Sequence, residues 1–548
     1  MSATKTNTSF YLIWRDIYLK RLIRNQLLSD VHINIDLDDL DDDGFVEYFS
    51  TVSTKDRLEN RIFIRLEILD KEYYREYLDH PHRHIINELC IEMIAVPKDY
   101  YFKKVGSLPV LFDWCLIPEQ VQKLSLYIHP SDDVVGQGRL HDGLIDLFIG
   151  SQEDEFNCEL VDGLLLSLPP NLQKLSLPSQ YEIKVKGVQL PSSLHTLDYE
   201  CKFDSLKNLI VPSDNHTLKD FRIVDIKLDD LQYLGHQSWI NDISLFNIND
   251  NIEADLLPSH IKYLSLKNTL GLRGSSLPRG LESLTLYRRF NLDGLPTTLK
   301  SLAIFFGQPH NRLFLPQGLV RIEIYDFDQP LNGLFSSTSN LESLRLDEFN
   351  HNIQIGDLPN SLTTLKLQRF NQPLPPFVLP RGLKNLIINR YNHSLEKDTI
   401  PPLVSILHIG SFCNSYSSIG PLDCLKEIEV YSLDESLGLM LGNVKKISIM
   451  FRCIQARDTL RSCTSIQNLT LCQLSSPSIL KIRSNRPLPA EFLPGNLRKL
   501  KTTRVEFEPV KGVIPDGCVF LETDIFDLSP DILPLSIKRY KYKGHYNV

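Results

Sequence analysis

The sequence lacks the segments that lead a chain into or across a membrane. Residues 1–10 are polar and contain no apolar core of the kind found in secretory signals. No run of about 18 apolar residues occurs, so no membrane span is expected. The 10 cysteines form no C-x-x-C pair and show no regular spacing. In a chain without an export signal we expect reduced thiols, most of them filling the core. The expected location is the cytoplasm or the nucleus.

The sequence also has no excess of positive charge and none of the common catalytic motifs. Its net charge is -9, which argues against a nucleic-acid surface because such domains are usually basic. H-E-x-x-H, G-x-S-x-G, G-x-x-x-x-G-K-[ST] and G-x-G-x-x-G are all absent. We therefore predict no cofactor and expect that the chain is not an enzyme. An enzyme with an unfamiliar site is the alternative from another functional class.

Two polar stretches have the composition of metal sites without the spacing. Asp39–Val46 matches the first half of an EF-hand calcium loop, but Ser50 stands where the loop needs a bidentate Glu. This favours a solvated acidic turn between a strand and a helix. Near a predicted helix boundary lie His80, His82 and His84, whose neighbourhood offers only Asp79 as a further ligand. A polar turn is favoured there, and no metal site is predicted.

The feature that organises the chain is a tandem repeat, clearest in residues 358–395. Leu379-Pro380 stands 21 residues after Leu358-Pro359, and each pair is followed by leucines or isoleucine in the pattern L-x-x-L-x-L. Each copy then closes on an aromatic residue and an asparagine, at Phe370-Asn371 and Tyr391-Asn392. A fixed period in the low twenties with this spacing is the signature of a solenoid in which each unit is one coil.

Further copies begin at other prolines and extend from about residue 108 to the end of the sequence. The alternating L-x-L pair predicts one short strand per coil, and stacked strands predict a parallel sheet over an apolar interior. Proline suits the bend before the strand. The aromatic residue is expected to fill the coil, and the asparagine to satisfy backbone groups and form a ladder along the stack. The copies that start with proline do so at Pro118, Pro169, Pro191, Pro258, Pro278, Pro296, Pro316, Pro401, Pro494 and Pro534.

Residues 1–105 do not show the period, so we assign them to a small mixed α/β cap and residues 106–548 to the solenoid. An amphipathic helix is predicted over Phe10–Leu28, strands over Val31–Leu37 and Ile62–Leu69, and a partly helical segment over Tyr73–Ile94. On the outer face of the first helix we expect Arg15, Lys20, Arg21, Arg24 and Asn25.

The repeat resembles the FNIP repeat, a leucine-rich-repeat-like unit named for a Phe-Asn-x-Pro core. Phe370–Pro373 fits that core fully, and Phe327–Pro330 and Phe306–Pro309 fit it in part. The opening segment Ser9–Ile23 is similar to the leader of many FNIP-repeat proteins. The resemblance implies a β-rich solenoid, wound as a right-handed coil of about 21-residue repeats with a parallel sheet.

The resemblance also implies a binding scaffold. Some members of the family carry an F-box before the repeats and are presumed substrate adaptors of ubiquitin ligases. Here the first helix has the Trp14-Arg15 pair of an F-box but lacks its Leu-Pro opening. Two hypotheses follow: a non-catalytic scaffold for a protein partner, or a ubiquitin-ligase substrate receptor whose residues 1–30 dock an adaptor.

The candidate partner-binding residues lie on the expected sheet face. There the residue between the paired leucines and the residue after the pair point outward, and solenoids bind through this face. Tyr287, Phe305 and Tyr325 are expected about 5 Å apart on consecutive strands. With Arg345 and Lys366 nearby, they have the composition of a protein-binding hot spot. The alternative is an aromatic ladder that only supports neighbouring strands.

Overall fold

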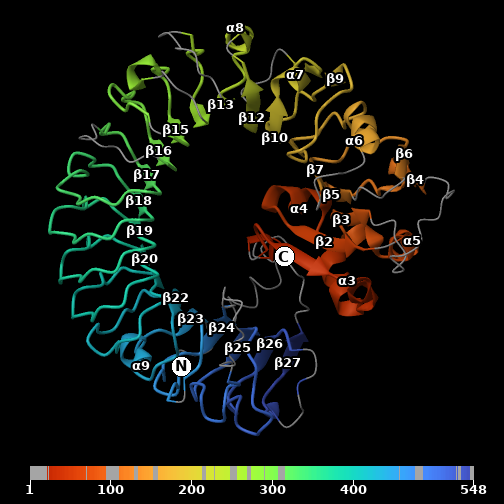
Figure 1. Cartoon of the computed structure of the whole chain (residues 1–548). Helices are drawn as coiled ribbons and strands as arrows, with labels where there is room; N and C mark the ends of the chain where they lie inside the picture. The colour runs from red at the N-terminus through yellow and green to blue at the C-terminus, as the bar shows by residue number, and fades with distance from the viewer. Residues whose placement is uncertain are drawn as a thin grey trace, which may run out of the picture. The chain divides into compact units, whose positions relative to one another are not determined.

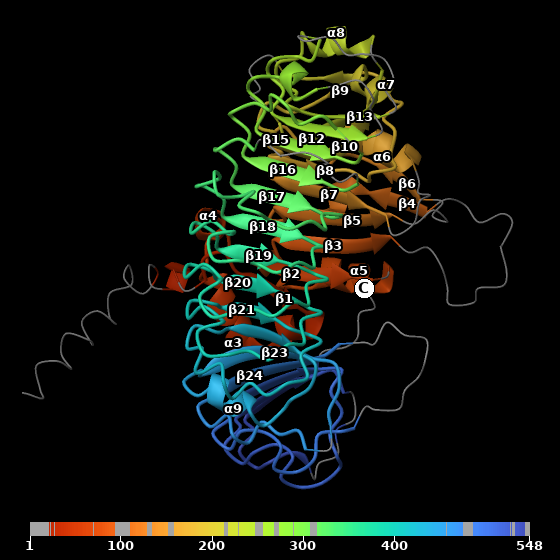
Figure 2. The same cartoon turned by 60° about the vertical axis from the view of Figure 1, so that its left-hand side comes forward.

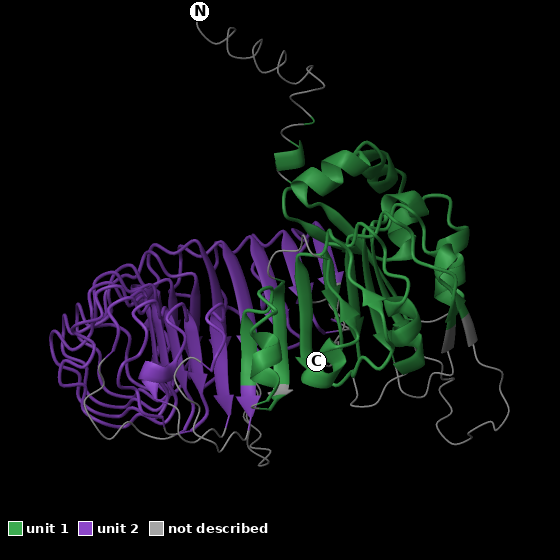
Figure 3. Ribbon diagram, turned by 90° about the horizontal axis from the view of Figure 1, so that it is seen from above, with its two compact units in different colours: residues 1–244 green, residues 245–548 purple. Residues whose placement is uncertain are grey.

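The chain folds into two compact units, residues 1–244 and 245–548, in a computed structural model (Figure 3). The residues that the structure describes are 21, 24–26, 28–69, 71–93, 110–128, 134–151, 158–212, 218–227, 229–246, 256–267, 273–288, 290–306, 315–455, 457–474, 486–525, 528 and 532–542. Among these residues, no helix has both the length and the apolar character needed to cross a bilayer. Most of the predicted leader helix, Phe10–Leu28, lies outside them.

Unit 1 is built on a parallel ladder of strands, most of which are labelled in Figure 1. Its strands pair in the order β1 His32–Ile35, β2 Phe63–Ile68, β3 Glu88–Met93, β5 Lys123–Ile128, β7 Asp146–Gly150, β8 Lys174–Ser176, β10 Thr196–Lys202 and β12 Lys219–Ile226. Two smaller parallel pairs are β4 Val110–Asp113 with β6 Val134–Gln137, and β9 Val188–Gln189 with β11 Leu209–Ile210. Strand β13, Asp242–Phe246, spans the boundary between the units.

Short helices connect the strands of unit 1. The α-helices are α3 Asp43–Ser50, α4 Thr54–Asn60, α5 Lys71–Asp79, α6 Cys158–Leu165, α7 Phe203–Leu206 and α8 Asp230–Leu234. The 3₁₀ helices are η1 Leu37–Asp41, η2 Arg83–Ile85 and η3 Trp114–Leu116. The two strands predicted before residue 70 are confirmed as β1 and β2. Helix was predicted in part for Tyr73–Ile94 and is confirmed for α5, whereas the end of that segment is β3. Residues 88–91 are all buried, including Leu89 and Ile91, as expected of a strand inside a parallel sheet.

The ladder continues across the predicted limit of the cap at residue 105. Strands β3 and β5 lie on either side of that limit and pair in register from Glu88 with Lys123 to Met93 with Ile128. Strands β1 to β3 thus belong to the same parallel sheet without the Leu-Pro signal that marks the later repeats. The boundary between the two compact units lies after Ser244.

Unit 2 is a regular parallel-sheet solenoid in which each coil adds one strand, as Figure 2 shows for β15 to β21. The strands pair in chain order: β14 Tyr263–Lys267, β15 Ser283–Leu286, β16 Ser301–Ile304, β17 Arg321–Ile324, β18 Ser343–Leu346, β19 Thr364–Lys366, β20 Asn385–Ile387, β21 Ile406–His408, β22 Glu427–Val430, β23 Lys446–Phe451, β24 Asn468–Gln473, β25 Lys499–Thr503, β26 Phe520–Thr523 and β27 Arg539–Tyr542. Its short helices are η4 Gly274–Ser276 and α9 Leu437–Met440.

The predicted inward positions form the interior of unit 2. In the coil of β19, Leu362, Leu365 and Leu367 are all buried. The aromatic residues of the Phe-Asn motif stack behind them through successive coils. Their ring centroids lie 6.3, 6.0, 6.2 and 6.4 Å apart along the series Phe327, Phe349, Phe370, Tyr391 and Phe412. The predicted solenoid with its aromatic filling is therefore confirmed.

The asparagines of the motif form the predicted ladder. The side-chain oxygen of each accepts the backbone N–H of the residue one coil later: Asn350 from Asn371 at 2.8 Å, Asn371 from Asn392 at 2.9 Å, and Asn392 from Cys413 at 2.9 Å. At the next position of the ladder Cys413 stands in place of asparagine, and its thiol donates to the carbonyl oxygen of Ser411. The ladder holds the turns of successive coils in register.

Replacing Asn371 with alanine is expected to lower the free energy of unfolding by about 1 kcal/mol, because the backbone N–H of Asn392 loses its acceptor in a solvent-exposed turn. Chemical denaturation followed by circular dichroism measures the change. Asn360→Ala is the matched control, since Asn360 is exposed in the turn after Pro359. Equal losses for the two variants would show that the ladder adds no stability.

A residue in the left-handed conformation recurs two positions before the Leu-Pro or Ile-Pro bend. Gly356 has φ +93°, Phe377 has φ +64° and Asp398 has φ +65°. Only glycine adopts this conformation without steric cost, so the coil of Phe377 carries local strain at an exposed aromatic residue.

Candidate partner-binding face

The candidate site is a row of three aromatic side chains that follow strands β15, β16 and β17. The backbone N–H groups of Tyr287, Phe305 and Tyr325 each donate to a carbonyl of the preceding coil, at 3.0, 2.8 and 2.9 Å. Pairing thus continues past the strand ends and holds the rings in register. Ring centroids lie 4.6 Å apart for Tyr287 and Phe305, and 4.3 Å apart for Phe305 and Tyr325. The interplanar angles are 2° and 10°. We call these three residues the aromatic row.

Both ends of the aromatic row are covered by cations. The Nζ of Lys267 lies 5.3 Å from the ring centroid of Tyr287, and the guanidinium carbon of Arg345 lies 4.5 Å from that of Tyr325. Each ring face is therefore covered by another ring or by a cation, which is a favourable electrostatic arrangement. Since all three side chains are only half-buried, the row offers ring edges to a partner rather than ring faces.

Arg345 is held in place by Asp347, just past the end of its own strand, and by the ring of Tyr325, which follows the neighbouring strand. Its Nε and Nη2 donate to the two carboxylate oxygens of Asp347 at 2.9 and 2.8 Å. This hydrogen bonding raises the pKa of Arg345 against the effect of its burial. The hydroxyl of Tyr325 donates to Glu323 Oε2 at 3.0 Å. Burial and that hydrogen bond raise the pKa of Tyr325. The end of the row is therefore a fixed polar network.

The structure brings four of the five predicted residues into direct contact. The fifth, Lys366, pairs in register with Arg345 on the next strand and is half-buried. The geometry of the aromatic row is that of the ladder considered as the alternative. Partner binding by these residues stays a prediction.

Sequence reasoning missed a depression of about 390 Å³ just past the ends of β18 to β20. Its lining includes Arg369, Arg390 and Arg452. The first two are spaced by one repeat, which is a signal that the sequence contains. Arg452 follows β23, so only the stacking of coils brings it near the other two.

The predicted polar stretches near residues 39–50 and 80–84 have local structural roles. Asp42 caps α3 by accepting the N–H of Phe45 at 2.7 Å, so the acidic stretch is a 3₁₀ helix followed by the start of an α-helix. His80 Nε2 lies 3.3 Å from Asp41 Oδ1. Across the part of the chain that the structure describes, no three His, Cys, Asp or Glu side chains are grouped as metal ligands would be.

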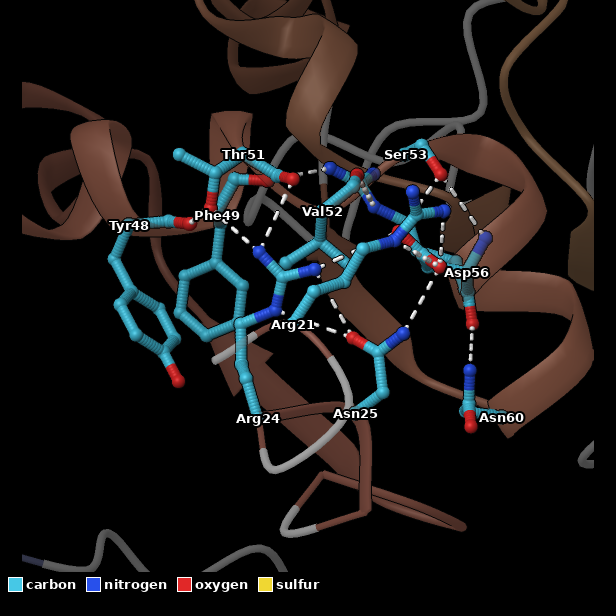
Figure 4. Close-up of polar contacts among 11 residues, drawn as sticks. Arg21, Arg24, Asn25, Tyr48, Phe49, Thr51, Val52, Ser53, Asp56 and Asn60 are labelled. Carbon is cyan, nitrogen blue, oxygen red and sulfur yellow. Dashed lines mark hydrogen bonds and ion pairs between the residues drawn. The ribbon is translucent and has the colours of Figure 1, made fainter. Parts of the chain in front are cut away.

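Arg21, Arg24 and Asn25 gather at a buried carboxylate on α4, drawn in Figure 4. Asp56 Oδ1 accepts from Arg21 Nη2 at 2.6 Å and from Asn25 Nδ2 at 2.9 Å, and Ser53 donates to Oδ2 at 2.9 Å. Burial alone would raise the pKa of Asp56, but the hydrogen bonds from Arg21, Ser53 and Asn25 lower it to about 2. The prediction that Arg24 and Asn25 face outward was wrong: Asn25 is 8% exposed, and the side chain of Arg24 is 14% exposed.

The model of the FNIP repeat family matches residues 338–369 and 349–390. These ranges contain the Phe-Asn motifs whose rings stack and whose asparagines form the ladder. Residues 338–390 carry FNIP repeats. The FNIP-repeat sequence has no match among curated proteins.

Two solved leucine-rich-repeat structures are similar to the FNIP-repeat chain. YopM from Yersinia enterocolitica WA-314 is 16% identical over 85% of this chain and 88% of its own, with a TM-score of 0.28. A chain of the mouse RP105/MD-1 complex is 12% identical over 86% of this chain and 76% of its own, with a TM-score of 0.33. Both scores are low, and neither likeness bears on function.

Proposed function

We propose that this FNIP-repeat chain is a non-catalytic interaction scaffold that binds a protein partner on the sheet face of unit 2, at the aromatic row. The observation that supports the proposal is the fixed geometry of Tyr287, Phe305 and Tyr325. Stacking and the two flanking cations already order these side chains, so binding costs little further side-chain entropy. Ordered aromatic edges beside an arginine are typical of interface hot spots.

The proposal predicts that serine substitution of the whole row abolishes partner recovery. The test compares wild-type chain, the variant Tyr287→Ser/Phe305→Ser/Tyr325→Ser, and the control Phe377→Ser, which removes an exposed aromatic side chain elsewhere in the same unit. Quantitative affinity capture should yield a partner with the wild type and the control, and lose it by tenfold or more with the row variant, since truncating hot-spot residues costs about 2 kcal/mol or more each. Circular dichroism checks that each variant is folded.

Unchanged recovery of the same partner by a folded row variant would reject the aromatic row as the binding site. The ubiquitin-ligase interpretation, in which residues 1–30 dock an adaptor, stays a prediction from the resemblance. Most of those residues, including Trp14-Arg15, lie outside the part that the structure describes. A deletion that tests this docking should remove residues 1–20 only, because Arg21 and Asn25 donate hydrogen bonds to Asp56.

A further inference from the structure

The depression past β18 to β20 has an unbalanced set of ion pairs. Arg369 Nη1 lies 2.5 Å from Glu348 Oε2, and Arg452 Nη2 lies 3.2 Å from Glu429 Oε1. Asp347, also in the lining, is engaged by Arg345. The remaining cation, Arg390, is exposed and has neither a hydrogen bond nor an ion pair with any residue that the structure describes. One guanidinium in the lining therefore lacks a counter-charge, on a chain whose net charge is -9.

A glycine makes room for this arrangement. In the coil of β21, Gly410 occupies the position after the apolar pair, where the preceding coils carry Gln368 and Asn389. A Cβ at Gly410 would collide with Glu429 Oε1 and lie 3.2 Å from Arg452 Nη2. The missing side chain thus lets the Glu429–Arg452 pair lie across the coil, so that Arg452 lines the same depression as Arg369 and Arg390.

Two amides in the lining retain hydrogen-bonding capacity. Asn389 Nδ2 donates to Gln368 Oε1 at 3.0 Å, while Asn389 Oδ1 is buried and has no hydrogen-bond partner among the described residues. Because the two ends of an amide have the same shape, rotating both side chains by half a turn keeps the bond between them. The same rotation turns the unpartnered acceptor into an N–H donor. The lining can then present guanidinium and amide donors together.

We propose that this depression binds a side-chain carboxylate of an acidic segment in the protein partner. The guanidinium of exposed Arg390 can donate two parallel hydrogen bonds to a carboxylate, and Arg369 and Arg452 add positive charge beside it. The inference rests on the proposed function, because it names the chemistry of the partner segment that crosses the coils beside the aromatic row. Tyr325 and Arg390 follow strands that are three steps apart in the sheet, which is about 14 Å at about 4.8 Å per strand. An extended segment covers that distance in about four residues.

The test uses fluorescein-labelled hexaglutamate as the probe and an otherwise identical hexalysine as its counterpart, with binding to the full chain followed by fluorescence anisotropy. Wild type is expected to bind hexaglutamate, more weakly as salt rises, and to bind hexalysine more weakly. Arg390→Glu is expected to weaken hexaglutamate binding by about five- to tenfold, the loss of one charge-assisted contact at an exposed site. Arg381→Glu makes the same charge change at another exposed position of the same coil and should shift the affinity by less than twofold.

A second variant tests the shape of the depression without changing its charge. Gly410→Ala is expected to displace Arg452 and weaken hexaglutamate binding by about threefold, a smaller loss than removal of a whole contact. The absence of hexaglutamate binding by wild type, or equal losses for Arg390→Glu and Arg381→Glu, would overturn the inference. The row variant Tyr287→Ser/Phe305→Ser/Tyr325→Ser should still bind hexaglutamate. Failure of partner capture at the row and failure of the carboxylate site are therefore distinguishable.

Discussion

Replacing Phe370 with alanine is expected to lower the free energy of unfolding by about 3–5 kcal/mol. Phe370 is 0% exposed, and its ring lies between those of Phe349 and Tyr391, 6.0 and 6.2 Å away. Truncation removes this buried surface and leaves a cavity in the middle of the stack. The neighbouring coils cannot close the cavity, because the strands on one side and the asparagine ladder on the other fix their spacing.

Guanidinium denaturation followed by circular dichroism measures this loss. The matched control is Phe377→Gly, which removes an aromatic ring from the same coil. Phe377 is 59% exposed and has φ +64°, a conformation that glycine adopts without strain. Its replacement is expected to leave stability unchanged or to raise it slightly. A cost below about 1 kcal/mol for Phe370→Ala would contradict the role of the stack in holding the coils together.

Replacing Asp56 with alanine is expected to lower the free energy of unfolding by about 3 kcal/mol at neutral pH, because several donors lose the buried carboxylate that they share. Asp56 accepts hydrogen bonds from Arg21, Asn25 and Ser53, and Asn25 is itself buried. The loss is expected in unit 1, where thermal unfolding of the full chain should begin at a lower temperature. A midpoint equal to that of the wild type would show that water replaces the carboxylate without cost.

The same residue predicts a dependence of stability on pH. The pKa of Asp56 is lowered from its ordinary value of 3.8 to about 2 in the folded chain. The folded state thus binds this proton less readily than the unfolded state. The contribution of the carboxylate is fully present above about pH 4 and is lost as the pH falls through about 2.

Denaturation of wild type and Asp56→Asn at pH 7, 4 and 2.5 checks this dependence. The difference in the free energy of unfolding between wild type and Asp56→Asn should shrink between pH 4 and pH 2.5. As the control, Asp38→Asn removes an exposed carboxylate of the same unit. This variant should lose stability between pH 4 and pH 2.5 as the wild type does. A constant difference between wild type and Asp56→Asn at all three pH values would contradict the network at Asp56.

Much of unit 2 was predictable because each coil repeats one local pattern. Leu365 and Phe370 are buried, and the Asn371 side chain bridges two coils, as their positions in the motif predicted. The coils before residue 105 were not recognised, since β2 and β3 follow the helices α4 and η2 instead of the Leu-Pro bend. The orientation of Asn25 was missed because its partner, Asp56, lies 31 residues away on another helix.

The sequence by itself determined the solenoid, its inward leucines, the aromatic filling and the asparagine ladder. These features depend on contacts between equivalent positions of adjacent coils, so the period of the repeat specifies them. Only the tertiary structure decided that cations cover both ends of the aromatic row, that Arg452 reaches the depression of Arg369 and Arg390, and that Asp56 binds Arg21 and Asn25. Those contacts join side chains that no periodic rule relates, and their geometry depends on how the coils stack.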